Sequence, residues 1–178
     1  MLASVTQTLR PSNDPTVRVN WCEILAERHP NIDWVNTAIW GATATRTELG
    51  PWCGVDQVAE ALSYNPDLVL IALGTNDLLR LGLEAETVAS TLVALHEEVE
   101  AGNVTGLVAL VPPVLNGDSE LAARINHTNE LVDAALGLVV DFYSRLEPSD
   151  FTQPDGVHFT QSGQNKRAAA AEAVIFGN

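Results

Sequence analysis

Two short polar segments carry the residue types that nucleophilic catalysis needs. Asp155 stands three residues before His158, and Asn76 follows an apolar run that ends in Gly74. A carboxylate can hold one imidazole nitrogen of a histidine, which leaves the other nitrogen free to take a proton from a nucleophile. An asparagine at the mouth of a buried strand can donate its amide to a developing oxyanion. Together the two segments predict an acyl-transfer hydrolase.

Each of these residues also has a simpler interpretation. His158 could be a surface histidine in a turn, and Asn76 could only cap its own turn. Asp77 could do that capping instead, with the amide of Asn76 pointing into a cleft. The sequence Asp-Gly-x-His-Phe before a helix favours a functional role for His158. The remaining histidines fit other positions: His29 a helix end, His96 an exposed acidic helix side, His127 a polar helix position.

Segments with strand and helix character alternate along the chain. Short apolar runs predict strands, and apolar residues at helical spacing predict helices. The expected strands are 32–36, 67–73, 104–111 and 138–141, and the expected helices are 17–28, 55–62, 84–101, 119–136 and 161–176. Helices of this length between strands imply parallel βαβ units with right-handed crossovers. Because functional loops in such folds lie at the carboxyl ends of the strands, Asn76 and His158 are expected on one rim.

Length and charge restrict the possible partners. The 178 residues fit a single domain over 1–178 with one core. Nine basic residues against 23 acidic ones give a formal net charge of −14, which repels phosphate backbones and argues against nucleic acid as a partner. No apolar run approaches the roughly 20 residues that span a bilayer. No secretory signal pattern is visible, so both a cytoplasmic and a secreted location stay open, as does the oligomeric state.

The cysteines and acidic groups do not predict a metal centre. Cys22 and Cys53 are the only two cysteines, and neither belongs to a CxxC or His-rich pattern. We therefore expect two buried thiols, or one disulfide if the compartment is oxidising.

Three blocks of the sequence resemble those of the SGNH hydrolases, also called the GDSL esterase/lipase family. Residues 74–77 (Gly-Thr-Asn-Asp) match the family's Gly-x-Asn-Asp block, and 155–158 match its Asp-x-x-His block. Residues 35–43 are similar to the block that holds an oxyanion glycine. The resemblance covers nearly the whole chain. It implies a flavodoxin-like three-layer α/β/α fold with a mostly parallel sheet in the order 2-1-3-4-5, and an esterase that uses neither a cofactor nor a metal.

The resemblance assigns roles to five residues. It makes His158 the base, Asp155 the partner that orients it, and Ser4 the nucleophile. The oxyanion hole would be formed by the N–H of Ser4, the backbone of Gly41 and the side chain of Asn76. Gly41 suits this role because a residue without Cβ lets a substrate oxygen approach its N–H closely.

The first block departs from the family pattern. Ser4 occupies the position of the nucleophile, but Leu2 and Ala3 replace the family's Gly and Asp. In the family this block directly follows the first strand, and here only Met1 precedes Leu2. We therefore expect a sheet that lacks its first central strand, in a chain truncated at the N-terminus.

The resemblance implies small acyl esters, carbohydrate O-acetyl groups or lysolipids as substrates. Trp40 and Trp52 flank the Gly41 loop and could stack on a sugar, although partly buried core positions are the simpler interpretation. Val157, within the Asp-x-x-His block, is expected beside the substrate. Two alternatives remain open: a catalytically inactive binding protein that uses the same cleft, and a peptidoglycan or phage-associated deacetylase.

Overall fold

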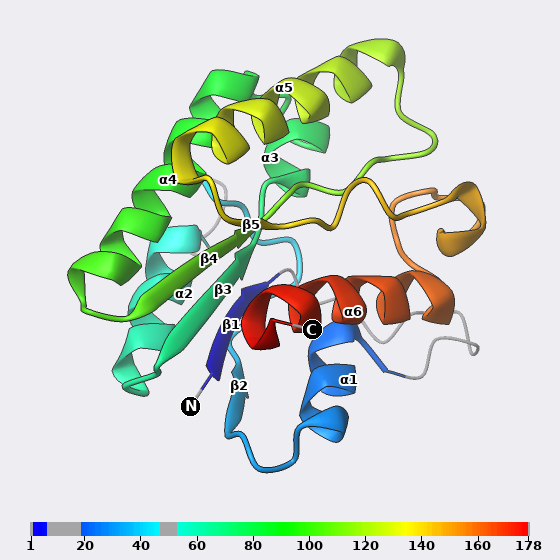
Figure 1. The fold of residues 1–178 in the computed structure, drawn as a ribbon. Coiled ribbons are helices and arrows are strands. Elements are labelled where there is room, and N and C mark those ends of the chain that lie inside the picture. Colours follow the sequence, from blue (N-terminus) through cyan, green and yellow to red (C-terminus); the bar gives the residue numbers. More distant parts are fainter. Residues whose placement is uncertain (1, 7–18, 47–52, 178) are drawn as a thin grey trace.

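The computed structural model describes residues 2–6, 19–46 and 53–177, with residues 2–6 described as backbone. Strands and helices alternate through these residues (Figure 1). In chain order the elements are β1 (Leu2–Thr6), α1 (Trp21–Arg28), β2 (Trp34–Asn36), α2 (Gly54–Ser63), β3 (Leu68–Ala72), α3 (Thr75–Leu79), α4 (Ala85–Ala101), β4 (Thr105–Ala109), α5 (Ser119–Leu136), β5 (Val139–Val140), η1 (Pro148–Asp150) and α6 (Gln161–Phe176).

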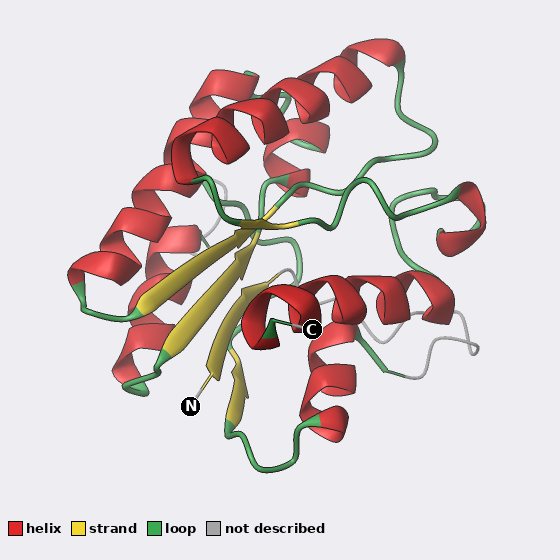
Figure 2. Ribbon diagram, in the orientation of Figure 1, coloured by secondary structure: helices red, strands yellow, loops and turns green. Residues whose placement is uncertain are grey.

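The strands form one parallel sheet in the order β2-β1-β3-β4-β5. Helices α1 and α6 contact each other and cover one face, while α2, α4 and α5 cover the other (Figure 2). The predicted three-layer α/β/α fold with a parallel sheet is therefore confirmed.

The central strand that we expected to be missing is present. Leu2–Thr6 forms β1, with Leu2 opposite both Trp34 of β2 and Leu68 of β3. The prediction was wrong because it followed the family's first block, in which the matching residues come after the first strand. Here these residues are themselves part of the strand. Without a strand between them, β2 and β3 would leave unpaired N–H and C=O groups inside the sheet, and β1 supplies their partners.

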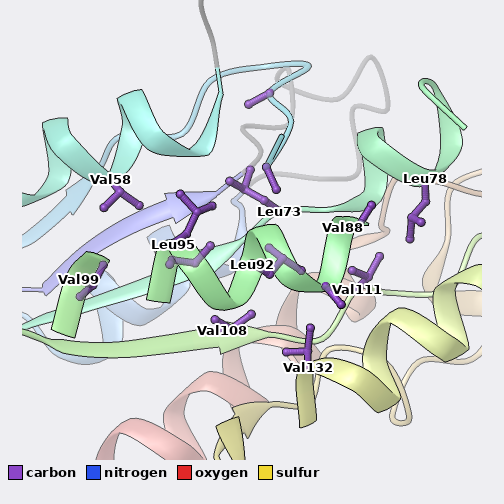
Figure 3. Packing of buried hydrophobic residues seen from close by; sticks show 14 of the residues in the cluster. Val58, Leu73, Leu78, Val88, Leu92, Leu95, Val99, Val108, Val111 and Val132 are labelled. Atoms are coloured by element: carbon purple, nitrogen blue, oxygen red, sulfur yellow. The ribbon is translucent and has the colours of Figure 1, made fainter. Parts of the chain in front are cut away.

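Strand β3 is apolar throughout because both of its faces are buried. Successive side chains of a strand point to opposite faces. Val69 and Ile71 pack into the cluster formed with α2, α4 and α5, and Leu70 packs into the cluster formed with α1 and α6. In Figure 3, Leu92 and Leu95 of α4 lie among the buried side chains of the first cluster.

Helix α1 begins later than the periodicity predicts. The Oδ1 atom of Asn20 accepts hydrogen bonds from the N–H groups of Cys22 and Glu23, both at 3.0 Å, and caps the helix at Trp21. Residues 17 and 18 of the expected helix lie outside the described residues. Among the described helices, none combines the length and apolar composition needed to cross a membrane.

Candidate active site

A pocket opens at the carboxyl ends of β3 and β4, where the loops of a parallel α/β fold meet. It is a small cavity of about 20 Å³ within a more open depression, and it is lined by Ala72, Leu73, Thr75, Ala109, Leu110, Pro112, Pro113, Phe142, Val157, His158, Phe159 and Arg167. The expected common rim is thus formed in part: Thr75, the neighbour of Asn76, and His158 line the same pocket.

His158 and Asp155 form a hydrogen-bonded pair at the pocket. The Oδ2 atom of Asp155 lies 2.8 Å from Nδ1 of His158. The other carboxylate oxygen accepts hydrogen bonds from the N–H groups of Val157 at 2.9 Å and His158 at 3.0 Å. The hydroxyl of Thr152 donates to the same oxygen at 3.1 Å. The carboxylate is thus fixed from several sides while it holds the imidazole.

These contacts keep Asp155 charged. Partial burial alone raises the pKa of a carboxyl, but the backbone hydrogen bonds from Val157 and His158 and the contact with the ring outweigh it, lowering the pKa of Asp155 to about 2. An ionised carboxylate can only accept, so Nδ1 of His158 carries the proton. In the neutral form of the ring, Nε2 is then the nitrogen without a proton, as a general base requires.

The loop that carries the pair is fixed by the segment after β4. The N–H of Leu115 donates to the carbonyl of Gly156 at 2.9 Å, and the amide of Asn116 donates to the carbonyl of Pro154. Gly156 has a φ of +65°, and a Cβ there would lie 2.9 Å from Cγ of Asn116. A larger residue would strain the turn and push Asn116 away. The peptide bond between Gln153 and Pro154 is cis.

Asn76 and Gly41 are brought together although 35 residues separate them in the chain. Nδ2 of the buried Asn76 donates to the carbonyl of Ala42 at 2.8 Å. An amide group has two N–H donors, so this bond uses one of them. Gly41 has a φ of +77°, and a Cβ there would lie 3.1 Å from Nη1 of Arg80. The backbone of Gly41 is therefore held beside α3.

Asp77 completes this clamp. Its two carboxylate oxygens accept hydrogen bonds from the N–H groups of Ala44 and Thr45, each at 2.8 Å. The side chain is fully buried, and both bonds cross from α3 to the loop after β2. Asp77 thus ties the Gly41 loop to the end of β3, rather than capping only its own turn.

Ser4 lies inside the sheet and not beyond its edge. Its backbone is opposite Leu70 of β3 and Asn36 of β2. Leu70 comes two residues before Ala72, which lines the pocket. Two residues of strand correspond to about 7 Å. The structure therefore brings Asp155 to His158 and Asn76 to Gly41, while Ser4 lies two positions inward from the rim.

The three expected substrate contacts have different surroundings. Trp40 is 50% exposed beside Gly41, and Val157 lines the pocket. Trp52 lies outside the described residues.

No disulfide links the two cysteines in this structure. Cys22 and Cys53 are both buried, and Sγ of Cys53 donates to Asp56 at 3.2 Å. In the described part of the chain, no group of three or more His, Cys, Asp and Glu side chains is arranged to hold a metal ion.

The other histidines have local partners away from the pocket. His29 follows α1 and lies 2.7 Å from Glu172, as a helix-end position suggests. His127 lies on helix α5, as predicted, and is exposed. His96 is half-buried, 3.9 Å from Glu100, so its predicted exposure is wrong.

Arg167 is the charged pocket residue that the sequence did not predict. Arg167 of α6 is buried and lines the pocket with His158. Its helical spacing from the buried residues Gln164 and Ala171 was the available signal, because side chains three and four apart share a helix face.

The parallel α/β fold and the Asp–His pair at the carboxyl ends of its strands agree with the expected SGNH hydrolase class. Over residues 4–166 the sequence matches the GDSL-like Lipase/Acylhydrolase family, and the chain belongs to this family. No match was found among curated proteins by sequence comparison.

Solved structures share the fold at low sequence identity. A member of the lipolytic protein G-D-S-L family from Veillonella parvula DSM 2008 is 19% identical with a TM-score of 0.78, over 99% of this chain and 98% of that one. The psychrotrophic esterase EstA from Pseudoalteromonas sp. is 20% identical with a TM-score of 0.71, over 98% of this chain and 95% of that one. A carbohydrate esterase family 3 protein from Talaromyces cellulolyticus is 15% identical with a TM-score of 0.77, over 99% of this chain and 97% of that one.

Proposed function

We propose that this chain hydrolyses small acyl esters, with Ser4 as nucleophile and His158 as base. The observation that carries the proposal is the contact of 2.8 Å between Nδ1 of His158 and the charged Asp155, at the edge of a pocket. The match to an acylhydrolase family over residues 4–166 supports the reaction class, and the choice of Ser4 rests on the resemblance of the first block.

The chemistry follows the usual two-step course of serine esterases. Nε2 of His158 takes the proton of the hydroxyl as its oxygen attacks the ester carbonyl. The backbone N–H groups of Ser4 and Gly41 and the second N–H of Asn76 stabilise the oxyanion. The imidazolium then protonates the leaving alcohol. Water releases the acyl group from the enzyme as a carboxylic acid, by the same steps.

The surroundings of Gly41 support a carbohydrate acetyl ester as one substrate class. The exposed ring of Trp40 offers a flat apolar surface on which a sugar can stack. The carbohydrate esterase among the similar structures agrees with this class. Lysolipid esters are the other class that the resemblance implies.

The position of Ser4 favours a second candidate function, an inactive binding protein that uses the same pocket. The backbone of Ser4 lies opposite Leu70, two strand positions or about 7 Å inward from Ala72 at the rim. A shift of β1 by two residues toward the rim would place the backbone of Ser4 opposite Ala72. Catalysis by Ser4 requires such a shift.

The deciding experiment is turnover of 4-nitrophenyl acetate by the wild type and three variants. We expect Ser4→Ala and His158→Ala to remove nearly all turnover. Thr6→Val is the matched control, because it deletes a hydroxyl from the same strand, opposite Ala72. If Thr6→Val abolishes turnover and Ser4→Ala does not, the nucleophile is Thr6 and our assignment is wrong. If the folded wild type is no faster than His158→Ala, the protein is a binding protein.

A further inference from the structure

Arg167 is a buried cation in the wall of the candidate active site. Its residue is 8% exposed. The guanidinium carbon lies 4.5 Å from the ring centroid of Phe142, 4.6 Å from that of Phe159 and 5.8 Å from that of Trp21. Aromatic rings attract a cation through their faces and compensate part of its lost hydration. They do not accept the N–H groups in the guanidinium plane as a carboxylate does.

Within the described residues, Arg167 has no carboxylate partner, and its Nε has no hydrogen-bond partner. Its neighbour Lys166 shows the opposite situation, with Asp150 at 2.7 Å and Glu147 at 3.5 Å. The chain has 23 acidic residues against nine basic ones, so a shortage of carboxylates does not explain why Arg167 has no carboxylate partner.

The buried arginine is still a cation at neutral pH. Burial lowers the pKa of Arg167 to about 9, above the neutral range. A buried charge without a partner destabilises the folded protein unless a counter-ion arrives. A guanidinium presents paired N–H donors that match the two oxygens of a carboxylate.

Arg167, Phe142, Phe159 and His158 line one pocket, so the cation lies beside the proposed base. We propose that Arg167 is an anion subsite and that the preferred substrates are esters carrying a carboxylate on the acyl or the alcohol part. This inference rests on the proposed esterase function and names its substrate class.

The net charge of −14 acts against an anionic substrate at long range. Such repulsion between exposed charges is largely screened beyond about 8 Å at physiological ionic strength. A buried guanidinium acts on a bound carboxylate at contact distance, where screening is weak. The guanidinium of Arg167 therefore determines the affinity for the carboxylate, while the negative surface charge slows the association of the substrate.

The test compares two pairs of esters that differ only in a carboxylate. The acyl pair is 4-nitrophenyl hydrogen adipate and its methyl-capped diester. The alcohol pair is 4-butanoyloxybenzoate and its methyl ester. We expect wild-type kcat/KM to favour the charged member of one pair by tenfold or more, and Arg167→Met to remove this preference. Methionine suits the substitution because its unbranched side chain fits between aromatic rings.

Arg145→Met is the matched control, since it removes the same charge from an exposed arginine on the loop after β5. It is expected to keep the preference, and Arg167→Lys to keep part of it. If the wild type shows no preference in either pair, or if Arg167→Met retains it, the anion subsite is ruled out.

A binding measurement separates this inference from the esterase proposal. Adipate is expected to raise the Tm of the wild type, while dimethyl adipate is not, and Arg167→Met is expected to lose the response. If no ester is turned over, the esterase proposal fails, and the adipate shift still tests Arg167. If Arg167→Met does not fold, Arg167→Gln, which also removes the charge, replaces it in the melts. Equal Tm values of the wild type with and without adipate overturn the subsite.

Discussion

At the residue scale, the partner of His158 determines which ring nitrogen carries a proton. In Asp155→Asn the amide can still accept a backbone hydrogen bond, but its NH₂ then faces Nδ1 of His158. The proton moves to Nε2, which can no longer act as base. We expect kcat for ester hydrolysis to fall by about 10³–10⁴ with the fold intact, because an amide in this position fixes the wrong tautomer. Nitrophenyl ester kinetics check this, and an unchanged kcat would contradict the role of Asp155.

The same carboxylate predicts a pH dependence of stability. The pKa of Asp155 falls from its ordinary 3.8 to about 2, so the folded state favours the charged form. A group whose pKa is lowered by folding stabilises the folded state at pH values above its unfolded-state pKa. This stabilisation is lost as the pH falls toward the folded-state pKa. The difference in free energy of unfolding between wild type and Asp155→Asn is therefore expected to shrink from pH 4 to pH 2. Urea titrations at several pH values measure it. A constant difference would show that the carboxylate charge is not responsible.

Single residues also show what the sequence can predict. Asp155 and His158 were identified because their contact is local, three residues apart, and any turn of this kind brings them together. The clamp by Asn76 and Asp77 could not be predicted in detail, because their partners lie more than 30 residues away in a loop. Arg167 was not predicted as a pocket residue because an arginine in an alanine-rich helix resembles a solvent-exposed residue.

At the element scale, Asp77 joins α3 to the loop after β2. Asp77→Ala leaves the buried N–H of Ala44 and the partly buried N–H of Thr45 without acceptors. We expect the free energy of unfolding to fall by about 2 kcal/mol or more, since each unsatisfied buried donor costs roughly 1–3 kcal/mol. Urea denaturation measures the loss.

The control for this prediction is Asp133→Ala, which removes an exposed carboxylate from α5. Surface substitutions of this kind usually change stability by less than about 0.5 kcal/mol. Equal stability of the two variants would mean that Asp77 is not a clamp.

The elements differ in how far their sequences specify them. The bounds of α5 and α6 were predicted to the residue because each has a side-chain cap at its start and a left-handed glycine at its end. Helix α3 was missed, since five residues are too few to show a period. Strand β1 was missed because a short segment becomes a strand through pairing with its neighbours, which no local pattern records.

At the scale of the whole molecule, the net charge of −14 predicts a dependence of stability on salt. Like charges on a folded chain repel one another, and unfolding lets them separate. Raising NaCl from about 0.01 M to about 0.1 M shortens the Debye length from about 30 Å to about 10 Å. We expect Tm to rise over this range in thermal melts followed by circular dichroism. A falling Tm would mean that attractive ion pairs outweigh the repulsion.

The parallel pairing of β1 has a practical consequence for handling the protein. Leu2 aligns with Leu68 and, through β3, with Thr105, so the chain enters β1 at the end of the sheet opposite the carboxyl ends of β3 and β4 (Figure 1). The pocket lies at those carboxyl ends. A peptide fused ahead of Leu2 would emerge there. Attaching the protein to a solid support through such a fusion would leave the mouth of the pocket facing the solution.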